Sequence, residues 1–236
     1  MNNLLKLEFT RLKRQKSFYV CTVIMVALIF LSMLTANALA NASPEIAAEF
    51  KASGIESLVG GMNNSSFALI ASIFAVLFVC EDYDQQIVKN IYARGYSRKS
   101  VYLSKMISVL AATSVMFIIV ELGNFKFLAV VGTQYVVAMA NIALAFAIAS
   151  VLRRNGGSIA GIILAPMLVG VVCGLADSFL NIEDFTLTSL WLSNFMTDVS
   201  TLAVSTERML VCLVGSLIYI PVFVIAGLYF NKKIEL

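Results

Sequence analysis

Histidine is absent from this sequence, and charged residues of all kinds make up only 13% of its 236 residues. The lack of histidine removes the usual general base near neutral pH and excludes a Ser-His-Asp triad. The chain also has no GxxxxGK[ST] phosphate loop, no HExxH motif and no pair of acids inside an apolar run. We therefore predict no catalytic residue, no metal site and no ATP hydrolysis by this chain.

Cysteine is scarce as well. The four cysteines stand in or beside apolar runs, and no two of them form a CxxC pair. This pattern indicates neither a zinc site nor a disulfide framework. Hydrophobic residues make up 60% of the chain, whereas soluble domains have about 45–50% apolar and about 25% charged residues. The composition therefore predicts an all-α protein that crosses a membrane several times.

Six apolar runs have the length and composition of transmembrane helices, which need about 20 residues. They cover residues 17–36, 62–80, 101–120, 127–152, 158–175 and 209–230. No repeat and no shift in composition divides the chain, so we expect one transmembrane domain over residues 1–236.

The basic residues predict how these spans are oriented. Lysine and arginine are enriched in the cytoplasmic segments of membrane proteins. With both ends of the chain in the cytoplasm, only Lys51, Lys126 and Arg208 of the 17 basic residues lie outside. We therefore expect a multi-pass protein of the plasma membrane with both termini and the loops after spans two and four in the cytoplasm.

The segment before the first span has helical periodicity. Leu5, Phe9 and Leu12 recur on one side of a helix, and Arg11 and Lys13 lie among the basic residues around them. Such a helix would lie in the membrane interface and be attracted by anionic lipid. The alternative is a basic flank that only follows the positive-inside rule.

Spans four and five contain residues suited to helix contacts. Gln134 and Asn141 in span four would form hydrogen bonds between helices or line a transport pathway. Small residues line span five, which would therefore contact another helix in its own chain or in a partner. They are Gly157, Gly161, Ala165, Gly170 and Gly174.

The longest external loop contains LTSLWLSNFM, residues 187–196, with the only tryptophan, Trp191. The run is too short to span a membrane. We expect an interfacial or partly re-entrant segment in which the Trp191 indole lies among lipid headgroups.

The connection between spans two and three predicts an amphipathic helix of about three turns, from Tyr83 to Arg94. Gly95 would end this helix, and Ser97 would cap the next one. The apolar face would pack on the bilayer surface or in a groove of a cytoplasmic partner. That face comprises Tyr83, Ile87, Val88, Ile91 and Tyr92.

This connection resembles that of permease subunits in the type-2 ABC transporter family. The acidic segment 82–90, Gly95, the Ser97–Arg98 pair and Lys105 match the family pattern. Gln86 stands where that pattern has glycine, and Ile87 stands where it has threonine. The basic N-terminal helix, the six spans and the long last external loop also fit.

The resemblance implies a permease that pairs with a second permease, identical or related, above two ATP-binding cassette subunits. Residues 83–94 with Gly95 would be the coupling helix, seated in a groove of the ATPase. ATP and Mg²⁺ would bind only to the ATPase subunits. The small-residue face of span five would be a candidate seam between permeases.

The resemblance further suggests ATP-driven export of an antimicrobial peptide or another amphipathic substrate from a bacterial cell. Two alternatives stay open: a membrane immunity or scaffold protein that binds partners without transport, and a small oligomeric channel. The expected partners are proteins and membrane lipid, and no nucleic acid.

Overall fold

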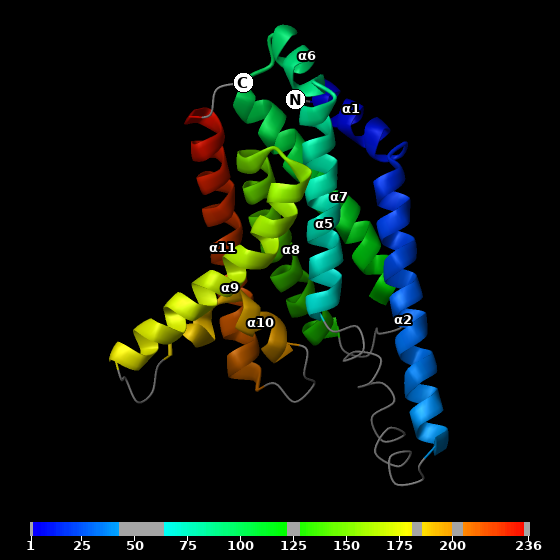
Figure 1. Ribbon diagram of the computed structural model, residues 1–236, viewed down its shortest axis with the longest axis vertical. Coiled ribbons are helices and arrows are strands. Elements are labelled where there is room, and N and C mark those ends of the chain that lie inside the picture. The colour runs from blue at the N-terminus through cyan, green and yellow to red at the C-terminus, as the bar shows by residue number, and fades with distance from the viewer. Residues whose placement is uncertain (1, 43–63, 122–127, 181–185, 200–204, 234–236) are drawn as a thin grey trace.

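The computed structural model describes residues 2–42, 64–121, 128–180, 186–199 and 205–233, and all regular elements in these ranges are helical. Most of the long helices run along one bundle axis (Figure 1). In chain order the elements are α1 Asn2–Leu12, α2 Lys16–Ala42, α5 Asn64–Asp84, α6 Ile87–Ala93, α7 Arg98–Glu121, α8 Leu128–Leu152, α9 Asn155–Leu180, η2 Thr188–Leu190, α10 Leu192–Val199 and α11 Thr206–Lys233.

Five of the described helices are long and apolar enough to cross a membrane: α5, α7, α8, α9 and α11. They correspond to the predicted spans two to six. The predicted first span lies in α2, a helix of 27 residues.

Helix α8 is the centre of the bundle and packs against α5, α7, α9, α10 and α11. Its sequence explains this position, because small side chains let neighbouring helices approach closely. Six alanines of α8 are buried: Ala138, Ala140, Ala143, Ala145, Ala147 and Ala149. Large aromatic side chains fill the space around them, and Phe74, Phe78 and Phe146 are almost completely buried.

Helices α9 and α11 form the periphery and expose most of their apolar side chains. Helix α9 changes direction part-way along, and its second half leaves the bundle axis (Figure 1). Pro166 lies inside this helix, and proline kinks a helix because it removes a backbone hydrogen bond.

The segment 186–199 packs into the end of the bundle opposite α6 (Figure 1). Leu192, Phe195 and Val199 of α10 are buried. The Trp191 indole nitrogen donates to the carbonyl oxygen of Pro166 in α9, 3.0 Å away. The indole therefore holds this segment against α9, and its depth among lipid headgroups stays a prediction.

Two charged side chains, Asp177 and Arg208, hold the same segment in place. The Asp177 carboxylate of α9 accepts hydrogen bonds from the backbone nitrogens of Leu187 and Thr188, at 2.6 and 2.8 Å. Arg208 of α11 donates to Asp198 at 2.8 Å and to the carbonyl oxygen of Ser189 at 2.5 Å. The segment is thus fixed to both peripheral helices.

Candidate functional site

The predicted connection folds differently from the single helix expected over residues 83–94. Helix α5 continues through Asp84, and α6 begins only at Ile87 and ends at Ala93. Between them Gln86 adopts a left-handed conformation, with φ of 55°. Tyr83 therefore belongs to the span helix, and the short helix has about two turns because the left-handed residue interrupts it.

Gln86 occupies the position at which the family pattern has glycine. A left-handed backbone costs a residue with a Cβ about 1–2 kcal/mol, whereas glycine adopts it freely. We expect Gln86→Gly to raise the free energy of unfolding by up to about 1 kcal/mol, measured as thermal stability in detergent. Gln85→Gly is the matched control. It should lower the free energy of unfolding, since φ is not positive at Gln85 and glycine has no conformational advantage there. Equal losses in both variants would contradict this account of the break.

The apolar face of α6 packs inside the chain. Val88 and Ile91 are buried, and Ile91 forms a cluster with Leu4 of α1 and Val101 of α7. Ile87 and Tyr92 are partly buried at the edge of that cluster. Burial also raises the pKa of the Tyr92 hydroxyl above its ordinary value, in spite of the nearby cations Arg153 and Arg98. Val88 and Ile91 therefore pack within the chain, whereas Ile87 and Tyr92 keep part of their surface accessible, and their contact with a partner stays a prediction.

The other face of α6 is polar and exposed. Lys89, Asn90, Ala93 and Arg94 are accessible along it. These residues lie at the tip of the bundle, at the end where α1 begins and α11 finishes (Figure 1). A partner approaching this end would thus meet two cationic side chains and an amide.

The predicted helix stop and restart are both present. Gly95 has φ of 84°, a conformation that suits glycine, and its nitrogen donates to the Tyr92 carbonyl oxygen at 2.9 Å. The Ser97 hydroxyl accepts from the Ser100 nitrogen at 3.2 Å and caps α7.

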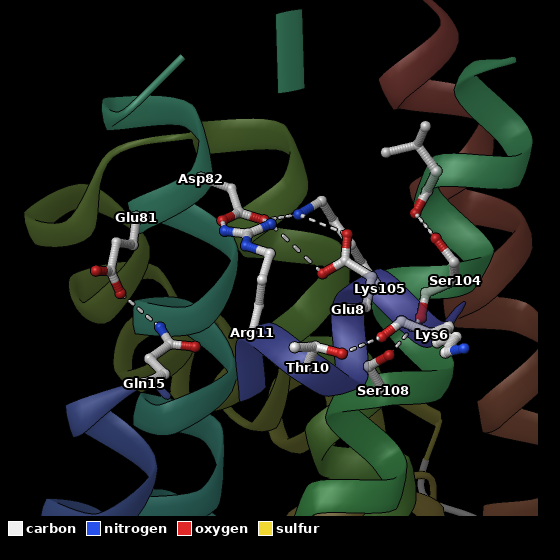
Figure 2. A network of polar contacts seen from close by, with 11 residues as sticks. Lys6, Glu8, Thr10, Arg11, Gln15, Glu81, Asp82, Ser104, Lys105 and Ser108 are labelled. Atoms are coloured by element: carbon white, nitrogen blue, oxygen red, sulfur yellow. Dashed lines mark hydrogen bonds and ion pairs between the residues drawn. The ribbon is translucent and has the colours of Figure 1, made fainter. Parts of the chain in front are cut away.

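Directly beneath α6, a cluster of four charged side chains joins three helices (Figure 2). Glu8 and Arg11 come from α1, Asp82 from α5 and Lys105 from α7. Arg11 binds both oxygens of Asp82, with Nη1 3.0 Å from Oδ2, and Lys105 contacts the same carboxylate. The Glu8 carboxylate lies 3.6 Å from Arg11 and 3.5 Å from Lys105. We call these four residues the charge cluster.

Three residues of the charge cluster are buried, and Arg11 is partly exposed. Glu8 and Asp82 are 0% and 1% exposed, and Lys105 is 3% exposed. Burial raises the pKa of Glu8, and the attraction of Arg11 opposes this shift only in part. Buried charges of this kind are tolerated only when they are paired, so the cluster fixes α1, α5 and α7 relative to one another.

Sequence patterns alone did not identify the charge cluster. Lys105 lies inside the bundle, where two acids from other helices compensate its charge. The one signal available was Glu8, a lone acid in a basic segment, spaced four residues from both Leu4 and Leu12.

Helix α1 buries a different stripe from the predicted one. Leu4, Glu8 and Leu12 face the bundle, and α1 packs on α7. Of the predicted interfacial residues, Leu12 is buried, Leu5 and Arg11 are partly buried, and Phe9 and Lys13 are exposed. The interfacial role of this helix stays a prediction, with Leu7 and Phe9 as its exposed apolar side chains.

A second contact at the same end involves the turn between α8 and α9. Arg153, at φ of 55°, donates to the Asn231 side-chain oxygen of α11 at 2.9 Å. Its guanidinium lies 4.9 Å from the centre of the Tyr83 ring. Nearby, the Asn155 amide donates to Asp84 at 3.2 Å. The α5–α6 junction therefore also contacts the peripheral helices.

The small residues of span five face the chain's own elements. A Cβ on Gly161 would lie 2.9 Å from Ile148 of α8, so this glycine permits close contact between α8 and α9. The nearest neighbours of Gly170 and Gly174 are Trp191 and Thr188, at 4.0 Å. Gly157 has no such neighbour, and Ala165 is partly exposed.

The two polar residues of span four bind α10. The Gln134 amide donates to the Val199 carbonyl oxygen at 2.9 Å. The Asn141 amide donates to the Val137 carbonyl oxygen at 3.2 Å and lies 3.0 Å from the Met196 sulfur. Gln134 is therefore a helix-to-helix contact, whereas Asn141 also lines a cavity.

Comparison with known proteins identifies the family. Neither the curated proteins nor the solved structures contain a match. The family described as "ABC-2 family transporter protein" matches residues 4–181, which include α1, the α5–α6–α7 connection and the charge cluster. Since the match covers well over half of the chain, this protein belongs to the ABC-2 family of transporter proteins.

Proposed function

We propose that this chain is the transmembrane subunit of an ATP-driven ABC exporter and that α6 receives the movement of an ATPase subunit. The observation that carries the proposal is the way α6 packs on the bundle. Its apolar face is fixed to α1 and α7 by Leu4 and Val101, while its cationic face is exposed at the tip of the bundle.

This arrangement favours transmission of force. A push on α6 would reach α1 and α7 through the Ile91 cluster. The charge cluster beneath it would pass the displacement to α5. The chain offers no ATP-binding motif of its own, and family membership implies partnership with ATP-binding cassette subunits, which would bind ATP and Mg²⁺.

The proposed topology has six spans, with α2 as the first, in one transmembrane domain. The cationic end that carries α6 would face the cytoplasm, in agreement with the distribution of basic residues. We further propose a bacterial plasma membrane and a second permease, identical or related. Because Gly161 of α9 contacts α8 of the same chain, the exposed apolar side of α9 beyond Pro166 is the better candidate seam.

For the substrate we propose a peptide or another amphipathic molecule. The alternatives are an immunity or scaffold protein without transport and an oligomeric channel, neither of which requires an ATPase subunit on the cationic face of α6. The experiment below separates these functions from a permease.

We expect the double variant Lys89→Glu with Arg94→Glu to lose its ATPase subunit. Reversing both exposed charges places like charges against a surface that had been complementary, which should weaken binding by more than about tenfold. The measurement is co-purification of the ATPase with a tagged permease from membranes, quantified by mass spectrometry, together with ATPase activity.

The matched control is Lys13→Glu with Arg14→Glu, which makes the same charge change at exposed positions outside α6. It should keep its ATPase. Val88→Asp, by contrast, should reduce the amount of folded permease, because Val88 is buried. Undiminished co-purification with the Lys89/Arg94 variant would disprove the coupling role of α6.

A further inference from the structure

A cavity of about 340 Å³ lies part-way along the bundle, between α5, α8, α9 and α10. Its polar lining consists of Ser72, Asn141, Ser193 and Thr197, and the remaining lining residues are apolar. Ser72 lies well inside α5 and Asn141 lies well inside α8, so the cavity is far from the ends of these two helices. None of the described residues that line it is charged.

The serine hydroxyls of this cavity are unusual. Serines in membrane helices usually bond to a carbonyl oxygen of the preceding turn, as Ser104, Ser108 and Ser150 do here. Within the described part of the chain, the hydroxyls of Ser72 and Ser193 have no hydrogen-bond partner. Both hydroxyls are therefore available to a molecule in the cavity.

Asn141 provides a third group. Its amide nitrogen is engaged by Val137 and Met196. Its side-chain oxygen has no partner among the described residues, so it can accept a hydrogen bond from a donor in the cavity. Two hydroxyls and one carbonyl oxygen together suit a ligand that has both donors and acceptors.

The cavity is reached from the side of the bundle. Leu69 of α5 and Ile163 of α9 line it and are 48% and 51% exposed. Both belong to membrane-spanning helices, so the opening faces the apolar surroundings of the bundle. A molecule that entered here would arrive from the bilayer and could leave an apolar tail outside the cavity.

A second cavity, of about 540 Å³ between η2, α10 and α11, provides a contrast. Its lining is apolar apart from Tyr219, whose hydroxyl already donates to the Leu190 carbonyl oxygen at 3.1 Å. That cavity suits an acyl chain only, whereas the cavity around Ser72 can discriminate by hydrogen bonding.

We propose that the cavity around Ser72, Asn141 and Ser193 binds the uncharged, amide-bearing part of an amphipathic molecule that enters from the bilayer between α5 and α9. The proposal rests on the transport function proposed above and narrows its substrate class. A charged group is excluded, because the cavity has no counter-ion and burial of an unpaired charge is costly.

The test uses two photo-reactive probes that differ only in their terminal group: N-octanoyl-photo-leucine methylamide, which is neutral, and N-octanoyl-photo-leucine, which is a carboxylate. The purified full chain in lipid nanodiscs is irradiated with each probe, and labelled residues are mapped by mass spectrometry. We expect the neutral probe to label α5 and α10 around Ser72 and Ser193, and the carboxylate to label them far less.

Ser72→Ala with Ser193→Ala should weaken labelling by the neutral probe by about tenfold, the effect of losing two neutral hydrogen bonds. This change should not affect folding, since neither hydroxyl bonds to any of the described residues. Leu69→Trp should reduce labelling by narrowing the entrance, and Ser178→Ala in α9, outside the cavity, should have no effect.

Equal labelling by both probes, or unchanged labelling of the double serine variant, would overturn the proposal. The labelling experiment contains no ATPase subunit. A negative labelling result would therefore not contradict the coupling role of α6, which the co-purification experiment tests.

Discussion

Asp82→Asn is expected to lower the free energy of unfolding by about 3–5 kcal/mol, the loss typical of breaking a buried ion pair. Asp82 is 1% exposed and accepts from Arg11 of α1 and Lys105 of α7. The asparagine would keep the shape of the side chain but leave the buried Lys105 and the partly buried Arg11 with only Glu8. Since burial raises the pKa of Glu8, this acid is a poor replacement.

The measurement is the thermal stability of the detergent-solubilised chain, followed by fluorescence-detected gel filtration. The matched control is Asp84→Asn, two residues along the same helix. Asp84 is exposed and makes a hydrogen bond of 3.2 Å with Asn155, so its loss should be below about 1 kcal/mol.

A double variant tests the electrostatic explanation. Asp82→Leu with Lys105→Met removes one charge of each sign and leaves Glu8 paired with Arg11. Replacing a buried ion pair by apolar residues is often neutral or stabilising, so most of the lost stability should return. If the double variant were less stable than Asp82→Asn, the loss would come from packing and not from unpaired charge.

Gly227→Ala is expected to destabilise the bundle by about 1–3 kcal/mol, the usual cost of inserting a methyl group into a packed core. A Cβ at this position would overlap the Tyr102 hydroxyl and lie 2.9 Å from the Tyr102 ring carbon and 3.2 Å from Ala147. Tyr102 cannot move aside easily, because it is 3% exposed and packs edge-on against Phe146, with ring centres 5.0 Å apart.

The control variant, Gly132→Ala, is expected to have the opposite effect on stability. Gly132 of α8 has open space around the position of a Cβ. Alanine favours a helix over glycine by about 0.5–1 kcal/mol, so Gly132→Ala should be neutral or slightly stabilising. Both variants are compared by thermal stability in the same detergent. Equal effects would show that α11 does not approach α7 and α8 as closely at Gly227 as the structure has it.

The α5–α6 connection shows how far local patterns predict structure. The Gly95 stop and the Ser97 cap follow from local backbone chemistry, and both were predicted. The division of the 83–94 helix was not, because Gln86 can continue a helix on propensity alone. Its left-handed conformation accompanies the packing of Val88 and Ile91 against other helices.

The glycines of α9 and α11 also show that a local pattern does not by itself predict a close helix contact. Span five has the more conspicuous small-residue pattern, and of its glycines only Gly161 has a close contact, with α8. The tightest approaches are at Gly215 and Gly227 of α11, where a Cβ would collide with Phe195 and Tyr102. Spacing along one helix indicates where a close approach is tolerated, but the partner's side chain decides whether it occurs.

The sequence by itself determined the properties that depend on local composition. These are the helical membrane class, the positions of the five described helices that are long and apolar enough to cross a membrane, and the absence of an ATP-binding motif. Only the tertiary structure decided which charges meet and which faces are buried. Glu8, Asp82 and Lys105 lie far apart in the sequence, and their burial is tolerable only because three helices bring opposite charges together.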